Sequence, residues 1–515
     1  MLIVFGVVTF VTISQSGGVN RGFKLKLPAH SDRLDWLKLP IDKIVRIRPI
    51  PNVLFVTDKR FLSFSIDSSQ IQRGFINPSL KNAKLRRAVS HLGGGYLRLG
   101  GTAADLLEFR AVSHVSPKKQ LPTDGGECIY DNQQCLYVDN KGPKGVIMTG
   151  ADWIEINEFA KAVGLKLLFD LNVLLRINDT WDSSNAENLL DYSFAHHYNV
   201  DWQLGNEPNV FKNTFGVEVS PTSLAADFGT LRHLLQQYSY YNTSLVVGPD
   251  ISRPRDLFMP ATGYLQEFLN AGALVDAVTW HHYYTGPNAT LQDFLKPDLY
   301  DSFKHSCLVI FNVVKKSRAR RKPIWLGETG SAYGGGVANL SDAFVSSLLW
   351  TDKLGLAARE GISLIIRQSL YRNHYALLDE HTLDPNPDYW ISILYKKLVN
   401  NKVLNVTYDQ DISDQTLRVY AHCSTKGTIV IFGVNIGNLT YGLNFRMNTT
   451  SKLYSLRGTP DLSHRNVVLN GVRLSLTREG QLPVFQPILV SLMKPVPVPS
   501  YSVFFLQIYL NLTVC

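Results

Sequence analysis

The 515-residue sequence predicts an α/β fold, in which a (β/α)8 TIM barrel is followed by a C-terminal antiparallel β-sandwich. Apolar runs of strand length alternate with stretches of helical period over residues 57–394. After the proline-rich segment 384–388 the pattern changes to β-branched and aromatic runs with turns between them. The chain is also too long for one ordinary core, which favours a large domain plus a smaller one.

Eight apolar runs are the expected barrel strands. In chain order they are Phe61–Ile66, Tyr96–Leu99, Leu165–Phe169, Trp202–Leu204, Leu245–Val247, Ala277–Trp280, Ile324–Leu326 and Leu364–Arg367. Helical period lies between most of them, at Trp153–Ala162, Ala225–Gln237, Gly263–Ala271, Phe303–Val314 and Asp342–Ala358. An open doubly wound sheet is the structural alternative, but no glycine-rich phosphate fingerprint follows any of these runs.

The remaining segments complete the expected domain order. Residues 1–18 resemble a signal peptide, because an apolar run of about h-region length precedes small residues. No Lys or Arg precedes that run, so a buried strand is the alternative. Residues 19–56 form an N-terminal strand region, whose run Val45–Val56 contains Pro49 and Pro51 and is therefore expected at a sheet edge. Residues 115–145 are polar and rich in Gly and Pro, which indicates an insertion in the barrel or a processed linker.

Residues 395–515 are expected to form the β-sandwich. Its strands are predicted at Leu417–His422, Thr428–Val434, Val472–Leu476 and Val503–Tyr509.

Composition and charge describe a basic globular protein. A hydrophobic content of 45% with 18% charged residues excludes a disordered chain. The 52 Lys and Arg exceed the 43 Asp and Glu, which gives a net charge of +9 and is compatible with a polyanionic partner. The densest basic run, residues 315–322, precedes the seventh strand and is expected on the barrel face opposite the site. It could bind sulfated chains there or form an ordinary solvated surface.

Glycosylation signals and cysteines favour the secretory route, with a secreted or lysosomal protein as the result. Eight Asn-x-Ser/Thr sequons occur, at Asn178, Asn242, Asn288, Asn339, Asn405, Asn438, Asn448 and Asn511. With five cysteines, at least one stays unpaired within the chain. Cys128 and Cys135 could close a small ring, and a Cys423–Cys515 bond would tie the C-terminal module shut. No metal-ligand spacing is present, so we expect neither a metal nor another cofactor.

Two glutamates follow similar apolar runs. The run Trp202–Leu204 leads through Gly205 and Asn206 to Glu207, and the run Ile324–Leu326 leads through Gly327 to Glu328. These are the fourth and seventh expected strands, whose ends open on the same face of a barrel. Two carboxylates without a metal suggest glycoside hydrolysis, in which one acid protonates the leaving oxygen and the other attacks as a carboxylate. The alternative is that each glutamate only forms a salt bridge at the barrel rim.

These motifs resemble the retaining glycosidases whose acid/base and nucleophile follow strands four and seven, and more narrowly the heparanase family. The resemblance extends from about residue 45 to residue 515. It is carried by Tyr96–Thr102 (YLRLGGT), Trp202–Asn209 (WQLGNEPN), Thr279–Tyr284 (TWHHYY), Trp325–Gly336 (WLGETGSAYGGG), Thr351–Leu356 (TDKLGL) and Pro387–Trp390 (PDYW).

The resemblance implies a role for each matching residue. Glu207 would be the general acid/base and Glu328 the nucleophile, while Asn206 would hold the sugar 2-hydroxyl. Tyr283 would lie beside the nucleophile, and His281 would help to set the pocket or serve as a structural residue at the strand end. The positions expected to contact the uronic acid are Asp67, Thr102, Tyr333, Gly334, Gly335 and Tyr375. The candidates for a cationic cleft are Arg253 and Arg255, with Lys141 and Lys144.

The resemblance also implies an endo-β-glucuronidase that cuts heparan sulfate. The N-terminal strand region would join the β-sandwich, and Cys423–Cys515 matches a disulfide of that module. Residues 115–145 are shorter than the excised linker of mammalian family members, so a monomer and a processed heterodimer both stay open. Neither nucleic acid nor an integral membrane segment is expected after signal removal. The alternatives are a hyaluronan-cleaving member of the family, an exo-acting β-glucuronidase, and a non-catalytic heparan-sulfate-binding protein. Retention of the Gly327-Glu328-Thr329 motif, which inactive members lose, argues against the last.

Overall fold

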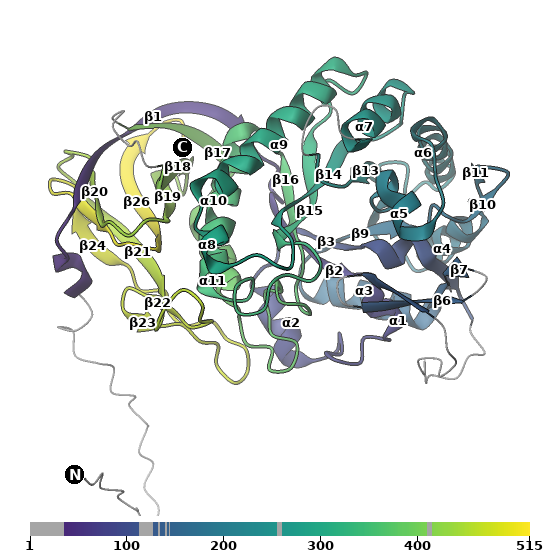
Figure 1. The fold of residues 1–515 in the computed structure, drawn as a ribbon, viewed down its shortest axis with the longest axis horizontal. Coiled ribbons are helices and arrows are strands. Elements are labelled where there is room, and N and C mark those ends of the chain that lie inside the picture. Colours follow the sequence, from purple (N-terminus) through teal and green to yellow (C-terminus); the bar gives the residue numbers. More distant parts are fainter. Residues whose placement is uncertain are drawn as a thin grey trace, which may run out of the picture.

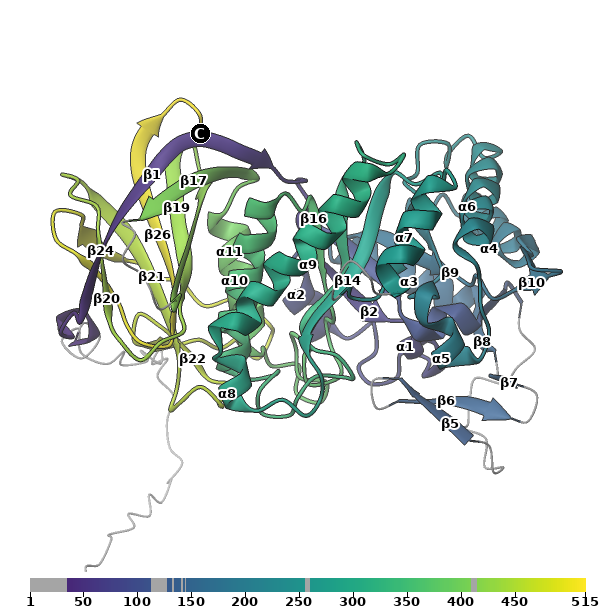
Figure 2. The same cartoon turned by 45° about the horizontal axis from the view of Figure 1, so that its top comes forward.

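The structure, a computed structural model, describes residues 35–112, 127–131, 134–139, 142–143, 145–254, 260–408 and 415–515. A parallel barrel forms one half of the molecule and a large mixed sheet forms the other, as Figure 1 and Figure 2 show. Helices α10 (Phe344–Glu360) and α11 (Pro387–Leu398) lie between the two halves. The predicted fold class is therefore confirmed.

Eight parallel strands form the barrel, in the spatial order β12-β9-β3-β2-β16-β15-β14-β13. Each one overlaps or adjoins a predicted strand. Their bounds are β2 Leu62–Asp67, β3 Tyr96–Gly100, β9 Lys166–Leu171, β12 Val200–Leu204, β13 Val247–Ile251, β14 Ala277–Thr285, β15 Ile324–Ala332 and β16 Leu364–Arg367. The ring closes between its outer strands, because the backbone N–H of Trp202 donates to the carbonyl of Leu245 at 2.9 Å.

Helices cover the outside of the barrel, and several begin at a capping residue. Thr149 and Asp152 form a capping box at α3, and Ser220 caps α6, where Pro221 takes the first helical position. The bounds of the helices are α1 Ser69–Gln72, α2 Ala83–Ser90, α3 Gly150–Ala162, α4 Ser184–Ala195, α5 Phe211–Phe215, α6 Pro221–Gln236, α7 Pro260–Asn270, α8 Leu291–Phe294 and α9 Pro297–Lys316. Short 3-10 turns lie at Asp35–Lys38, Thr102–Leu106 and Pro208–Val210.

The polar segment 115–145 contains regular structure that the sequence analysis did not predict. Strands β5 (Glu127–Asp131) and β6 (Gln134–Asp139) pair as an antiparallel hairpin, and β7 (Gly142–Pro143) pairs with β6. The segment leaves and rejoins the barrel between a parallel pair of strands, β4 (Leu107–Arg110) and β8 (Val146–Thr149). A second short hairpin joins β10 (Arg176–Ile177) to β11 (Thr180–Trp181).

The other half of the molecule is an eleven-stranded, mainly antiparallel sheet. Strands distant in its order, such as β20 and β21, place Leu443 and Leu453 in one hydrophobic core, so the sheet folds over on itself as a sandwich. The strands are β17 Lys402–Tyr408, β18 Leu417–Cys423, β19 Gly427–Asn435, β20 Tyr441–Asn444, β21 Thr450–Gly458, β22 Val467–Leu469, β23 Val472–Arg473, β24 Ile488–Ser491, β25 Val496–Val498 and β26 Ser502–Leu512.

The N-terminal strand β1 (Lys43–Val56) completes this sheet and arches over it in Figure 1. Its first four residues pair in parallel with β20, and the residues from Ile47 onward pair antiparallel with β17. Pro49 therefore lies where β1 has a strand partner on one side, which suits a residue without an N–H.

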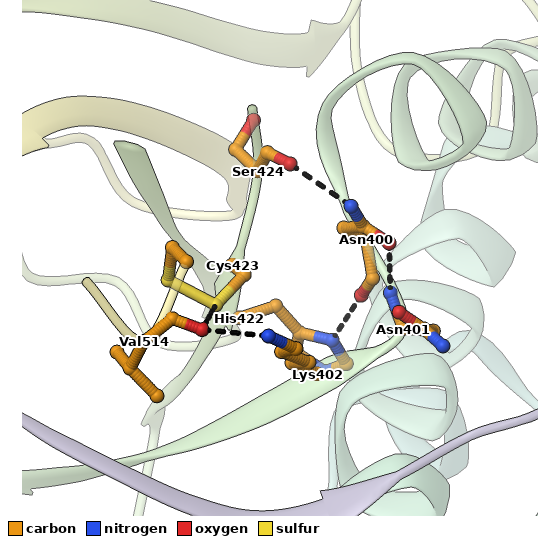
Figure 3. Close-up of a disulfide and its surroundings, with 8 residues drawn as sticks. Asn400, Asn401, Lys402, His422, Cys423, Ser424 and Val514 are labelled. Carbon is orange, nitrogen blue, oxygen red and sulfur yellow. Dashed lines mark hydrogen bonds between the residues drawn. A yellow bond between two sulfur atoms is a disulfide. The ribbon is translucent and has the colours of Figure 1, made fainter. Parts of the chain in front are cut away.

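A disulfide between Cys423 and Cys515 joins the end of β18 to the C-terminus of the chain (Figure 3). Cys307 is buried and unpaired within α9. Cys128 and Cys135 lie on β5 and β6, and their predicted bond falls outside the side chains that the structure describes. Seven of the eight sequon asparagines are exposed, whereas Asn405 is half-buried within β17. None of the helices in the described ranges is long and apolar enough to cross a membrane.

Candidate active site

Glu207 lies immediately beyond β12, at the carboxyl-terminal rim of the barrel. Its backbone is left-handed, with φ 54° and ψ 50°, and follows Gly205 at φ 84°. Two hydrogen bonds hold this turn: the N–H of Glu207 donates to the carbonyl of Asp250 at 3.0 Å, and the N–H of Asn206 donates to Asp105 Oδ2 at 3.0 Å. A left-handed non-glycine residue costs about 1–2 kcal/mol, so the surrounding contacts impose this conformation.

Glu328 projects from the middle of β15 because the strand contains an irregularity directly before it. Trp280 of β14 is opposite Leu326, but the next residue, His281, is opposite Glu328, so Gly327 is an extra residue. A Cβ atom at Gly327 would lie 2.4 Å from Asp250 Oδ1, which no side chain could tolerate. The glycine thus permits a bulge that re-aims the following side chain, and bulges commonly do this next to active sites.

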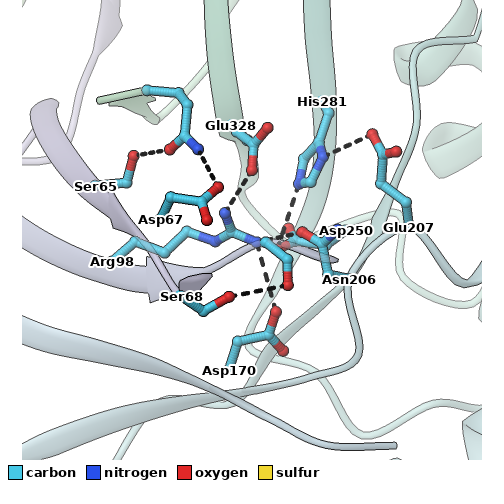
Figure 4. A network of polar contacts seen from close by, with 12 residues as sticks. Ser65, Asp67, Ser68, Arg98, Asp170, Asn206, Glu207, Asp250, His281 and Glu328 are labelled. Atoms are coloured by element: carbon cyan, nitrogen blue, oxygen red, sulfur yellow. Dashed lines mark hydrogen bonds and ion pairs between the residues drawn. The ribbon is translucent and has the colours of Figure 1, made fainter. Parts of the chain in front are cut away.

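Arg98 of β3 connects the nucleophile candidate to the floor of the site (Figure 4). Its guanidinium is fully buried and donates to Glu328 Oε2 at 2.8 Å, to Asn206 Oδ1 at 2.8 Å and to Asp250 Oδ2 at 2.9 Å. Because Arg98 occupies the amide oxygen of Asn206, the amide NH2 is the group that can donate to a sugar hydroxyl.

His281 connects the acid/base candidate to the same floor. Its Nδ1 lies 2.9 Å from Glu207 Oε1, and its Nε2 lies 3.5 Å from Asp250 Oδ2. Burial opposes the charged imidazolium, but the charges of Glu328 and Asp250 and the contact with Glu207 raise the pKa of His281 to about 10. His281 is therefore protonated near neutral pH and donates to Glu207.

Asp250 joins the two arms of this network. Burial favours its neutral form, but Arg98 and His281 hold the pKa of Asp250 below its usual range, so it is ionised. A continuous path of contacts thus runs from Glu328 through Arg98, Asp250 and His281 to Glu207. The two glutamates of the predicted pair belong to one polar network.

Tyr283 lies beside Glu328, as the sequence predicts. Its hydroxyl donates to Glu328 Oε1 at 2.7 Å, while Arg98 holds the other carboxylate oxygen. Burial and the charge of Glu328 raise the pKa of the Tyr283 phenol well above its usual value, so it stays a donor. Each oxygen of Glu328 therefore receives one strong hydrogen bond, which fixes the orientation of the carboxylate.

The residues expected to contact the uronic acid occupy neighbouring parts of the rim. Asp67, at the end of β2, accepts a hydrogen bond from Gln368 Nε2 at 3.1 Å, and burial raises its pKa. Tyr375 is buried with its ring 6.1 Å from that of Tyr283. Tyr333 is half exposed, and the glycines that follow it, Gly334 and Gly335, have positive φ. Thr102 begins the 3-10 turn that follows β3.

The predicted cationic cleft receives little support from the described residues. Arg253 donates through Nη1 to the carbonyls of Tyr283 and Tyr284, at 2.9 and 3.0 Å, so this part of its guanidinium braces β14. Arg255, Lys141 and Lys144 lie outside the described residues. Sulfate recognition by these four residues remains a prediction.

Sequence reasoning missed Arg98, Asp250 and Gln203 at the centre of the network, and also Gln368, which donates to Asp67 beside it. A signal was available for two of them, because Arg98 and Gln203 stand inside otherwise apolar predicted strands, where a charged or amide side chain needs a partner. Gln203 accepts from Arg98 Nε at 2.8 Å. Asp250 and Gln368 carried no such signal, because each lies at the end of a strand.

An eight-stranded parallel barrel with two glutamates at the ends of its fourth and seventh strands, joined by a network of hydrogen bonds and ion pairs, defines the class of barrel glycoside hydrolases. Solved structures agree with this fold. A 4-O-α-L-rhamnosyl-β-D-glucuronidase from Fusarium oxysporum superposes with a TM-score of 0.64 over 90% of this chain and 100% of that chain, at 14% identity.

Sequence comparison identifies the family. The N-terminal domain model of glycosyl hydrolase family 79 matches residues 67–355. Bovine heparanase is 36% identical over 84% of this chain and 85% of its own length. A hyaluronoglucuronidase from the leech Hirudo nipponia is 33% identical over 78% of this chain and 85% of its own length. The chain belongs to glycosyl hydrolase family 79, and it is a heparanase-like glycoside hydrolase.

Proposed function

We propose that this protein is a retaining endo-β-glucuronidase that cleaves internal glucuronic acid linkages of heparan sulfate. The observation that carries the proposal is the Glu328–Arg98–Asp250–His281–Glu207 network, which supplies an oriented carboxylate and a second carboxyl group at one rim of the barrel. The heparanases among its relatives favour a sulfated polymer, and the net charge of +9 suits it. Exposed sequons and the signal-like start support a secreted or lysosomal enzyme.

In the first step, Glu328 attacks the anomeric carbon as Glu207 gives its proton to the departing glycosidic oxygen. The bond from carbon to the leaving oxygen breaks, and an ester bond to Glu328 forms. Tyr283 and Arg98 hold the two oxygens of Glu328, so attack needs little reorganisation. The amide of Asn206 would bind the sugar 2-hydroxyl while positive charge develops in the ring.

In the second step, water replaces the leaving saccharide and Glu207 removes its proton. The water oxygen bonds to the anomeric carbon, the ester breaks, and Glu328 leaves as a carboxylate. His281, whose Nδ1 lies 2.9 Å from Glu207 Oε1, holds the Glu207 side chain in place for this second role. The same two acids therefore serve both steps without a cofactor.

Product sizing on heparan sulfate tests the proposal, with Glu328→Gln and Glu207→Ala as variants. We expect fragments of intermediate size from the parent protein and none from Glu328→Gln. Glu207→Ala should retain activity on an aryl glucuronide with a good leaving group, and azide should accelerate it by replacing the water that Glu207 activates. A Glu328→Gln protein that still fragments the polymer would refute the assignment.

Hyaluronan is the second candidate substrate. Two observations favour it. One of the relatives is a leech hyaluronoglucuronidase. In addition, Arg253 Nη1 donates to backbone carbonyls of β14, so this part of the predicted cationic cleft is already engaged within the protein. Incubation with hyaluronan under the same conditions separates the two. Fragments from hyaluronan alone would move the assignment to that polymer, whereas tight heparin binding without fragments from either would support a non-catalytic binding protein.

A further inference from the structure

Lys353 of α10 is a buried lysine that the mechanism above does not use. Its side chain is 1% exposed, in a helix that packs between the barrel and the sandwich. Nearby buried acids have other partners: Asp352 pairs with Arg418 at 2.6 Å, and Asp388 pairs with Arg367 at 2.8 Å. Within the described residues, the Lys353 amine makes polar contacts only with neutral groups.

Those contacts join the two strands that carry the catalytic side chains. Lys353 Nζ donates to Thr329 Oγ1 at 2.6 Å and to the carbonyl of Gly330 at 3.1 Å, both on β15. On β14 it donates to the carbonyl of His282 at 3.3 Å and lies 3.1 Å from His282 Nδ1. Thr329 Oγ1 in turn donates to the same His282 carbonyl, so the amine completes a bridge between the strands.

The bridge lies directly behind Glu328 and Tyr283. Side chains alternate along a strand, so His282 and Thr329 face α10 while Tyr283 and Glu328 face the pocket. The strands need support here because the Gly327 bulge interrupts their ladder just before this point. A Cβ on Gly330 would lie 2.8 Å from Tyr283, so the ring is packed against the backbone that Lys353 holds.

The energetic cost of burying the Lys353 amine also argues that this residue has a functional role. Burial lowers the pKa of Lys353 well below its usual value, and an apolar side chain of similar size would avoid that penalty. We propose that Lys353 is a positioning residue that sets the Glu328 carboxylate and its hydrogen bond from Tyr283 for nucleophilic attack. This inference rests on the proposed glycosidase function.

The first test compares Lys353→Met with a matched control, Lys396→Met. Lys396 is another largely buried lysine, on α11, but it donates to the carbonyl of Gly93 at the opposite end of the barrel. With an aryl glucuronide, Lys353→Met should lower kcat about tenfold or more and change KM by less than about threefold, because a small displacement of the nucleophile affects chemistry more than binding. Lys396→Met should keep the kcat of the parent.

A trapping reagent separates positioning from general damage to the fold. With 2-deoxy-2-fluoro-β-glucuronyl fluoride, Glu328 bonds to the anomeric carbon as fluoride leaves, so the trapping rate reports nucleophilic attack. We expect this rate to fall in Lys353→Met in proportion to kcat. The effect should be non-additive with Tyr283→Phe, since both changes act on the same carboxylate.

Substitutions of Thr329 test the same inference if Lys353→Met does not fold. Thr329→Val removes the hydroxyl that links Lys353 to His282 and should reproduce the loss, whereas Thr329→Ser keeps the hydroxyl and should restore kcat. A folded Lys353→Met with the trapping rate of the parent, or losses that add fully to those of Tyr283→Phe, would overturn the inference. An inactive parent protein would instead refute the proposed function.

Discussion

At the scale of single residues, the site balances buried charges of both signs. Arg98 and His281 are cationic, and Asp250 and Glu328 lie against them. One further acid, Asp170, is completely buried, and its nearest cation is Arg98 at 3.6 Å. Neither of its side-chain oxygens has a hydrogen-bond partner among the described residues. A buried carboxyl group in this position avoids the cost of ionisation by keeping its proton.

The protonation of Asp170 predicts a pH dependence of stability. Burial, with a contribution from Asp250 and opposed by Arg98, raises the pKa of Asp170 from 3.8 to about 8. The native state therefore holds a proton that the unfolded state releases, and this contribution is full below pH 3.8 and is lost as the pH rises through about 8. One proton changes the free energy of unfolding by at most about 1.4 kcal/mol per pH unit.

Asp170→Asn tests this prediction, because the amide has the shape of the protonated acid and cannot release a proton. The free energy of unfolding is measured with urea for both proteins at pH 5 and at pH 8. Between these two pH values it should fall less for the variant than for the parent. The comparison cancels other groups that titrate in both proteins, including His281. Equal losses in the two proteins would show that Asp170 is already ionised at pH 5.

At the scale of secondary-structure elements, the strands that carry function are the ones that the sequence described least completely. The apolar runs located all eight barrel strands. However, β14 and β15 extend five and six residues beyond the predicted ends at Trp280 and Leu326. Those extensions contain His281, Tyr283 and Glu328, whose polar side chains have no place in an apolar pattern. These residues are in strand conformation because β14 and β15 pair with each other. The pattern of a single segment carries no information about such pairing.

The candidate site was predictable to a similar extent. The two glutamates and their neighbours could be found because each motif follows an apolar run: Gly-Asn-Glu follows the fourth expected strand, and Gly-Glu follows the seventh. The links between them could not, because Arg98 reaches Glu328 across 230 residues and Asp250 across 152. Such contacts depend on closure of the barrel. The β5–β6 hairpin was missed because its apolar runs, Cys128–Tyr130 and Cys135–Val138, are short and lie within a segment rich in Gly, Pro and charged residues.

Gly327 provides the prediction at this scale. Gly327→Ala would place a methyl group 2.4 Å from Asp250 Oδ1 and 3.3 Å from Thr279 Cβ, so either the bulge or Asp250 must move. Both support the nucleophile, and we expect kcat to fall at least about 100-fold together with the melting temperature. Circular dichroism melting and aryl glucuronide kinetics measure the two effects.

Gly229→Ala is the matched control for Gly327→Ala. Gly229 lies inside α6, and its added Cβ would meet no atom within 4 Å. Alanine in a helix is favoured over glycine by roughly 0.5–1 kcal/mol, so this variant should be slightly more stable and fully active. An active Gly327→Ala protein would mean that the bulge does not fix the position of Glu328.

At the scale of the whole molecule, helix α10 makes contacts with both the barrel and the sandwich. The amine of its Lys353 bridges β14 and β15, while Asp352 accepts from Arg418 Nε and the Tyr420 hydroxyl of β18, each at 2.6 Å. A Cβ on Gly355 would lie 2.2 Å from the Tyr420 ring, so helix and sheet are in close contact. One hydrophobic core also continues from the barrel to Phe432 and Phe505 of the sandwich. We therefore expect barrel and sandwich to unfold as one cooperative unit.

Arg418→Met tests this expectation through the shared contact. The substitution leaves the fully buried Asp352 without its cation, which typically costs about 3–5 kcal/mol. Seven of the eight tryptophans lie within residues 153–390, so their fluorescence reports the barrel, while hydrogen exchange in β19 and β26 reports the sandwich. Both probes should give the same urea midpoint in the parent and the same lower midpoint in the variant. If only the sandwich shifted, the two halves would be independent folding units, and Asp352 would stabilise an interface between separate domains.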